Sequence, residues 1–241
     1  MDISVSGNGK ISAGEYQNIA IHGNAKLCGL VKCTNLKSSG SLKGESIECL
    51  ETFKANGNAY FYQSIKAENL YASGNLFSEG DLTIGQNISC SGRLKSQGTI
   101  RCKQLSISGS ARTNGEIQTN NAIINGNIRC NGLYSAENIQ IRFDGKTSLG
   151  SAHGNQITIS MKTSRKIWKS LLIFPLFIKK YNKNAHADSL NGNEINVEYT
   201  NCPQVTGKTI TIGKGCYIQL AQYSEKITIS PRAKVEKIVK I

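Results

Sequence analysis

Eight glycines recur at nearly equal intervals along the first half of the chain. Successive members are 16, 17, 17, 17, 18, 17 and 17 residues apart, and they are Gly7, Gly23, Gly40, Gly57, Gly74, Gly92, Gly109 and Gly126. A fixed period of this kind is typical of repeat architectures, in which short units stack and share one core. The ladder therefore restricts the chain to solenoid folds.

Apolar residues fall on alternate positions within each copy of the repeat, which is the period of a strand. The copies align from NIAIHGNAKLCGLVKCT at 18–34 to NAIINGNIRCNGLYSAE at 121–137. The second position then holds Ile19, Leu36, Phe53, Leu70, Ile88, Leu105, Ala122 and Ile139. One copy is too short to enclose a core. We therefore predict an all-β fold, a single-stranded parallel β-helix whose coils each add about 4.8 Å to a rod.

The sixth-position glycines are expected at a corner of the coil, where φ is positive or the backbone is crowded. Asparagines recur at the first position of the copy and again directly after the glycine, where they suit turns. The second group is Asn24, Asn58, Asn75 and Asn127.

The net charge of +13 indicates an anionic partner, but the charge is unevenly distributed. Residues 1–159 carry 15 basic and 11 acidic side chains, whereas residues 160–241 carry 14 and 5. No acidic residue lies between Asp144 and Asp188. We place the basic centre at 162–183 and expect no nucleic-acid partner.

The segment TSRKIWKSLLIFPLFIKKYNK at 163–183 combines this charge with apolar residues. Its stretch LLIFPLFI is about half of the ~20 residues that span a bilayer, and Pro175 interrupts it. The flanking basic and aromatic residues suit a loop or short helix at the surface of an anionic membrane. Alternatively, the segment folds back and covers a face or an end of the β-helix. The residues of this membrane or capping segment are Lys166, Trp168, Lys169, Leu171, Leu172, Phe174, Phe177, Lys179 and Lys180.

Catalytic and metal-binding patterns are missing from the sequence. The three histidines, His22, His153 and His186, are scattered, and no cysteine or carboxylate lies at metal-ligand spacing from them. We predict no enzyme, no cofactor and no metal. The chain opens MDISVSGNGK without the apolar run of a signal peptide, so its eight cysteines indicate a reducing cytoplasm. Four of them fall on inward positions, where cysteine packs as a small apolar residue: Cys33, Cys90, Cys102 and Cys130.

The 17-residue copies with their G-x-[AIL] step, as in SGNL at 73–76 and NGNI at 125–128, resemble the bactofilins, the polymer-forming bacterial cytoskeletal proteins. The resemblance spans about residues 2–160. The tail, with NEINVEYT at 193–200, is similar to longer Gram-positive relatives of that family. The resemblance implies a right-handed, three-faced β-helix that joins end to end into filaments without nucleotide, with head-to-head contacts. It differs from the usual pattern in that about 80 residues follow Ser160.

We divide the chain into a bactofilin-like β-helix at 2–160, a basic and apolar excursion at 161–186, and a C-terminal β-segment at 187–241. The last segment either adds coils or forms a small separate unit, and it could limit assembly to a dimer by covering the far end. We expect assembly at the edge of the first coil, through Ile3, Val5 and Ile11, because a terminal strand exposes unpaired backbone groups.

The predicted function is a non-enzymatic, self-assembling cytoskeletal scaffold in the cytoplasm, associated with the inner face of the cell membrane through the basic segment. Its protein clients are unknown. One alternative is a ligand- or carbohydrate-binding β-helix, although only Tyr60 and Tyr62 form an aromatic cluster. The other is a degenerate acyltransferase, whose coils would have 18 residues in three hexapeptides.

Overall fold

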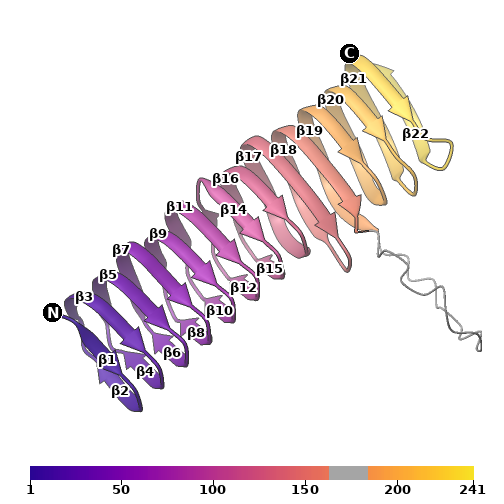
Figure 1. Cartoon of the computed structure of the whole chain (residues 1–241). Helices are drawn as coiled ribbons and strands as arrows, with labels where there is room; N and C mark the ends of the chain where they lie inside the picture. The colour runs from indigo at the N-terminus through magenta and orange to yellow at the C-terminus, as the bar shows by residue number, and fades with distance from the viewer. Residues whose placement is uncertain (163–183) are drawn as a thin grey trace, which may run out of the picture.

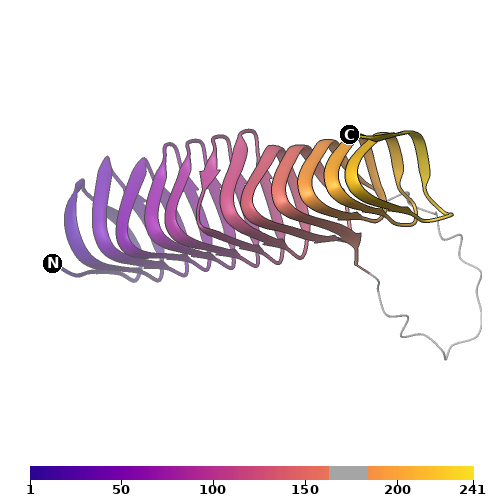
Figure 2. The same cartoon turned by 90° about the horizontal axis from the view of Figure 1, so that it is seen from above.

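A computed structural model describes residues 1–162 and 184–241, and these form a long rod of stacked coils. Its two termini lie at opposite ends (Figures 1 and 2). The column that begins at Ile3 continues in register through thirteen coils and reaches Ile227. All of these strand pairs are parallel, and the coil is right-handed. The predicted β-helix is therefore confirmed.

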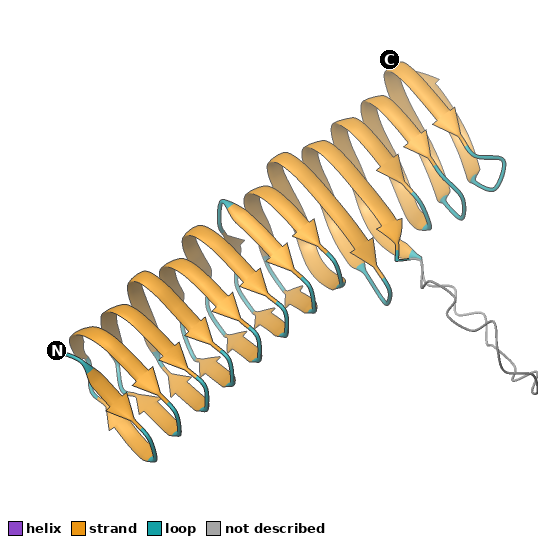
Figure 3. Cartoon of the chain, in the orientation of Figure 1, coloured by secondary structure: helices purple, strands orange, loops and turns teal. Residues whose placement is uncertain are grey.

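Each coil has three faces, which we define in the second coil: face A is 18–21, face B is 24–27 and face C is 31–33. Figure 3 shows only strands and loops in the described residues. Face B is made of short strands, which are β2 (Asn8–Ile11), β4 (Asn24–Leu27), β6 (Ser41–Gly44), β8 (Asn58–Phe61), β10 (Asn75–Ser78), β12 (Arg93–Ser96) and β15 (Ser110–Thr113).

Faces C and A are joined by longer strands, because the corner between them keeps strand geometry. These are β3 (Gly14–Ile21), β5 (Leu30–Ser38), β7 (Ser46–Ala55), β9 (Ile65–Ala72), β11 (Leu82–Cys90) and β16 (Glu116–Ile124), with β1 (Ile3–Val5) in the first coil and the divided pair β13 (Ile100–Arg101) and β14 (Gln104–Ile107). The later strands run round several faces and are β17 (Asn127–Phe143), β18 (Ser148–Met161), β19 (Ala185–Val197), β20 (Thr200–Ile212), β21 (Tyr217–Ile229) and β22 (Lys234–Lys240).

One continuous apolar core fills the rod, as the alternating pattern predicts. Leu105 and Ile117 are 2% and 0% exposed. Phe53, Phe61 and Phe143 are the largest side chains of the core. The rings of Phe53 and Phe61 both lie in the fourth coil and meet edge to face with 5.6 Å between centroids. Strict stacking of small and medium residues leaves the interior dry, and burial of these columns is the main source of stability.

The glycine ladder lies at the corner between faces A and B, and the reason for glycine there is crowding. A Cβ added to Gly40 would lie 1.9 Å from the carbonyl oxygen of Gly23, and the ladder glycines from Gly23 to Gly126 are crowded in the same way. The described glycines with positive φ are three others, Gly14, Gly29 and Gly215. Of the two predicted reasons, close approach of successive backbones is therefore the correct one.

The C-terminal strands stack directly on the earlier coils and form no separate unit. Strand β19 pairs with β18, so that Ile157 lies opposite Ile195. These two residues are 38 apart in sequence, whereas residues at the same place in consecutive coils are usually 17 apart. The difference equals the 21 residues of 163–183. Segment 163–183 is thus an insertion at the corner between faces A and B.

Candidate assembly ends and outer faces

The N-terminal end of the rod presents one unpartnered row of strands. Strands β1 and β2 pair with β3 and β4 on one side, and the described chain provides no strand on the other. The side chains of Ile3 and Val5 point inward and stay half-buried. Such a row offers both apolar surface and backbone donors and acceptors to another strand.

Ile11 was also predicted to belong to this exposed edge, and it lies in β2 of the unpartnered row, but its side chain is less open than those of Ile3 and Val5. It is only 2% exposed, because it points into the core opposite Leu27 of the next coil. The sequence pattern identified it as an inward residue but could not show that the first coil already covers it.

Two residues at this end were not singled out from the sequence. Tyr16 packs against the core from an inward position of face C, and its hydroxyl donates to the carbonyl oxygen of Ser12 at 2.9 Å. Asp2 accepts hydrogen bonds from the backbone N–H and the side-chain amide of Asn18, at 3.1 and 3.2 Å. Asp2 therefore begins the ladder of first-position amides, which continues where the Asn35 amide donates to Asn18.

The C-terminal end is also open in the described chain. Strand β22 pairs with β21, and no described strand lies beyond it. Ile227 and Ile229 are half-buried, and Ile238 is 48% exposed. The predicted cover for the far end is therefore absent from 184–241, because these residues form coils themselves. The repeat signal in 193–241 is weaker than in the earlier coils, so only the pairing register reveals this second apolar end.

Residues 71–165 match the model of the bactofilin family, which is described as polymer-forming cytoskeletal. Residues 71–165 therefore contain a bactofilin domain. The match covers the coils from the fifth to the insertion and supports the resemblance drawn from the 17-residue copies over that part of the chain. No curated protein matches the chain. No solved structure matches it either.

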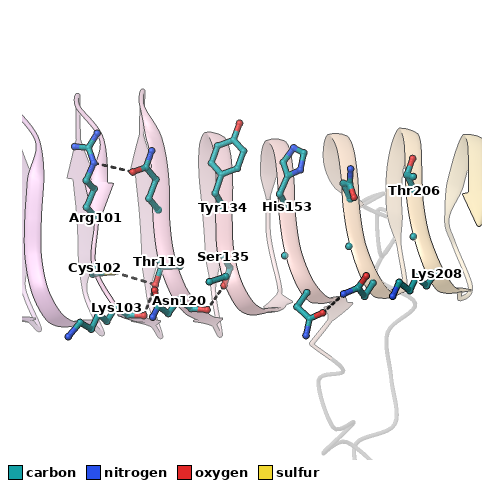
Figure 4. A pocket seen from close by; sticks show the side chains of 18 of the residues that line it. Arg101, Cys102, Lys103, Thr119, Asn120, Tyr134, Ser135, His153, Thr206 and Lys208 are labelled. Atoms are coloured by element: carbon teal, nitrogen blue, oxygen red, sulfur yellow. Dashed lines mark hydrogen bonds between the residues drawn. The ribbon is translucent and has the colours of Figure 1, made fainter.

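Face C of the rod holds a hollow of about 1090 Å³, which extends over several coils (Figure 4). Along it Arg101 donates to the side chain of Gln118 at 3.1 Å, and Tyr134 stacks on His153 with 5.2 Å between ring centroids. No acidic side chain is among the described residues that line the hollow. His153 therefore has no acidic side chain beside it in the described lining that could orient its ring as a general base.

The cysteines do not change this conclusion. Seven of the eight are buried, including the four predicted to point inward. The sulfur atoms of Cys33 and Cys49 lie 3.3 Å apart in adjacent coils. Burial raises the pKa of Cys102 to about 11 and that of Cys130 to about 12, so both stay protonated and unreactive at neutral pH. The structure thus supports their role as small core residues.

Within 1–162 and 184–241, no group of three histidine, cysteine or acidic residues could hold a metal ion. The described residues contain no helix that could cross a membrane. The predicted membrane or capping residues, from Lys166 to Lys180, lie outside the described part of the chain.

Proposed function

We propose that this chain is a non-enzymatic scaffold that assembles end to end through its terminal coils. The carrying observation is that both ends of the described rod are open and apolar along the same columns: Ile3 and Val5 at one end, Ile227 and Ile229 at the other. The family described as polymer-forming lends support over 71–165. End contacts are also expected of a solenoid, because its terminal coil exposes backbone donors, acceptors and apolar side chains that every inner coil buries.

Two joints are possible, and they differ in symmetry. In a head-to-tail joint Ile227 of one copy continues the column into Ile3 of the next, and the contact repeats without closing. In a head-to-head joint two N-terminal ends meet about a twofold axis, and two C-terminal ends meet in the next contact. The bactofilin resemblance favours the second arrangement.

Lysine substitutions at each end separate these joints. Ile3→Lys with Val5→Lys places charges at the first coil, and Ile227→Lys with Ile229→Lys does so at the last. Electron microscopy without nucleotide should show filaments of the wild type. With head-to-tail joints, either double variant should give monomers in light scattering. With head-to-head joints, each should give dimers joined by the intact ends.

A matched control is Ser4→Lys, which adds a charge to β1 but on the outer side of face A. It should assemble like the wild type. A wild-type chain that stays monomeric at high concentration, or double variants that still form filaments, would contradict end-to-end assembly.

We further propose that the scaffold is cytoplasmic and lies at the inner membrane face through residues 163–183. The support is the sequence of this segment, with basic and aromatic residues around an apolar stretch. The segment is inserted at a corner of one coil, so its removal leaves a coil of normal length. Deletion of 163–183 should therefore keep the β-sheet circular dichroism and abolish co-sedimentation with anionic vesicles. Vesicle binding that survives the deletion would refute this role.

A further inference from the structure

Face B carries an outward column of cations that the strand register brings into line. One residue per coil points outward at this position, and the column reads Lys10, Lys26, Lys43, Tyr60, Phe77, Lys95, Arg112 and Arg129. We call these eight residues the face B column. Neighbouring members are about 4.8 Å apart, so the column extends over about 34 Å.

The corresponding column on face C is electrically different. There Glu15 precedes Lys32 and Glu48 precedes Lys66, and nitrogen and oxygen atoms lie 4.0 and 3.1 Å apart in the two pairs. Arg101 is similarly paired with Asp81 at 3.4 Å.

The cations of face B have no such partners. None of the six forms an ion pair with a carboxylate of 1–162 or 184–241. Like charges directly opposite one another on adjacent strands repel, and an anion bound along the column would relieve this repulsion.

The face B column borders a continuous shallow groove. Three hollows of about 490, 370 and 500 Å³ follow one another along the face. The first two share Ser41 and Lys43, and the last two share Arg93 and Lys95. The opposite wall is a polar column of side chains that can hydrogen-bond, which are Asn8, Asn24, Ser41, Asn58, Asn75, Arg93, Ser110 and Asn127.

Aromatic rings occupy the middle of the groove. Tyr60 and Phe77 lie with 4.7 Å between their centroids, and the ammonium of Lys95 lies 4.7 Å from the Phe77 ring. Both rings are half-buried, so each keeps an open part beside the cations. A basic groove with aromatic contacts is the general way in which proteins hold an extended nucleic-acid strand without reading its sequence.

We propose that the face B groove binds a single strand of nucleic acid along the rod. Its length matches about ten nucleotides at the 3.4 Å rise of a stacked strand, and fewer in an extended one. Arg93 of the polar column and Arg112 and Arg129 of the face B column can each donate two hydrogen bonds to a phosphate group. From the sequence we expected no nucleic-acid partner. The sequence does not show this surface, because only the register between coils brings its residues into line.

Single-stranded nucleic acid fits better than a duplex or a bilayer. The cations form one column, whereas a duplex presents two phosphate backbones on either side of a groove about 12 Å wide. A flat anionic membrane would also lie over Glu45 and Glu79, which are exposed at the corner beside the column. A narrow chain in the groove meets fewer of these carboxylates than a flat membrane does, since only Glu79 reaches the column, where it accepts a hydrogen bond from Tyr60.

The test is fluorescence anisotropy of the full chain with a labelled oligothymidylate of about 15 nucleotides, over a range of salt concentrations. The groove variant carries Lys95→Gln, Arg112→Gln and Arg129→Gln. The control variant carries Lys32→Gln, Lys66→Gln and Arg101→Gln, which removes the same charge from face C. All six residues are outward, and thermal unfolding checks that both variants fold.

We expect the wild type to bind with a log–log salt slope of about −4, from six phosphate contacts. The groove variant should bind at least about tenfold more weakly with a slope near −2, and the control should match the wild type. The proposal is overturned if the oligonucleotide does not bind at low salt, if the groove variant keeps full affinity, or if both variants weaken equally. Tighter binding of heparin, duplex DNA or anionic vesicles to the same groove would overturn it too.

Discussion

The first and third coils are built from the same repeat, yet the same position has different constraints in each. An added Cβ at Gly7 would meet nothing within 4 Å, whereas at Gly40 it would overlap the carbonyl oxygen of Gly23. Likewise Ile3 is half-buried, while Ile19 and Leu36 of the same column are 2% and 1% exposed. In this rod the neighbouring coil decides what a residue does: inner coils use a position for stability, and end coils leave it free for assembly.

The largest effect expected from this comparison concerns charge in the core. Leu105→Lys or Ile117→Lys should lower the free energy of unfolding by more than about 4 kcal/mol, because an unpaired charge enters a dry stack. Ile3→Lys should cost far less, since the end column is open on one side. Chemical denaturation of the monomeric proteins measures both. Similar losses at Ile3 and Ile117 would show that the end coil is covered.

A second comparison uses the two glycines themselves. Gly40→Ala should destabilise by roughly 3 kcal/mol, because the backbones of two coils must separate to admit the methyl group. Gly7→Ala should stay within about 0.5 kcal/mol of the wild type, as expected for an open surface position. Thermal unfolding of the two variants gives the difference. Equal melting temperatures would mean that the corner is looser than its geometry indicates.

The neighbour also decides the sign of smaller, electrostatic effects. Lys66→Gln removes a partner of Glu48 and should cost about 0.5 kcal/mol or less, since the pair is exposed and screened. Lys26 lies between Lys10 and Lys43, so Lys26→Gln removes a repulsion and should raise the free energy of unfolding by a few tenths of a kcal/mol. Both differences should shrink in high salt. Destabilisation by Lys26→Gln would indicate that face B has an anionic partner within the chain.

The smallest effect is a titration at the surface. The Tyr60 hydroxyl donates to Glu79 of the next coil, which raises the pKa of Tyr60 to about 12. Because the folded pKa is the higher one, this contact contributes stability below about pH 10 that is lost as the pH rises through 12. The hydrogen bond to Glu236 also raises the pKa of Tyr217, so ultraviolet titration should show late-ionising tyrosines that include Tyr60 and Tyr217. The contribution of Tyr60 should be absent in Tyr60→Phe. In Glu79→Gln its pKa should fall toward the ordinary value, and an unchanged pKa would exclude the carboxylate as the cause.

Much of this fold could be predicted from local patterns. The 17-residue period, the alternation around Leu105 and the glycine ladder each act within a single coil. A coil of this composition can bury its apolar side only by stacking on its copies. The prediction of no active site also came from residue types and spacing. The bactofilin resemblance rests on the same short-range features.

Other features depended on register between coils and therefore on tertiary structure. The pairing of β18 with β19 showed that 163–183 is an insertion in one coil and that the tail continues the rod. The burial of Ile11 depended on how the first coil packs on the second. The face B column joins residues 16 to 18 apart, whose cations are interspersed with acidic residues along the chain. Sequence alone determined what each coil contains, but charges act through space, so only the stacking decided which of them meet.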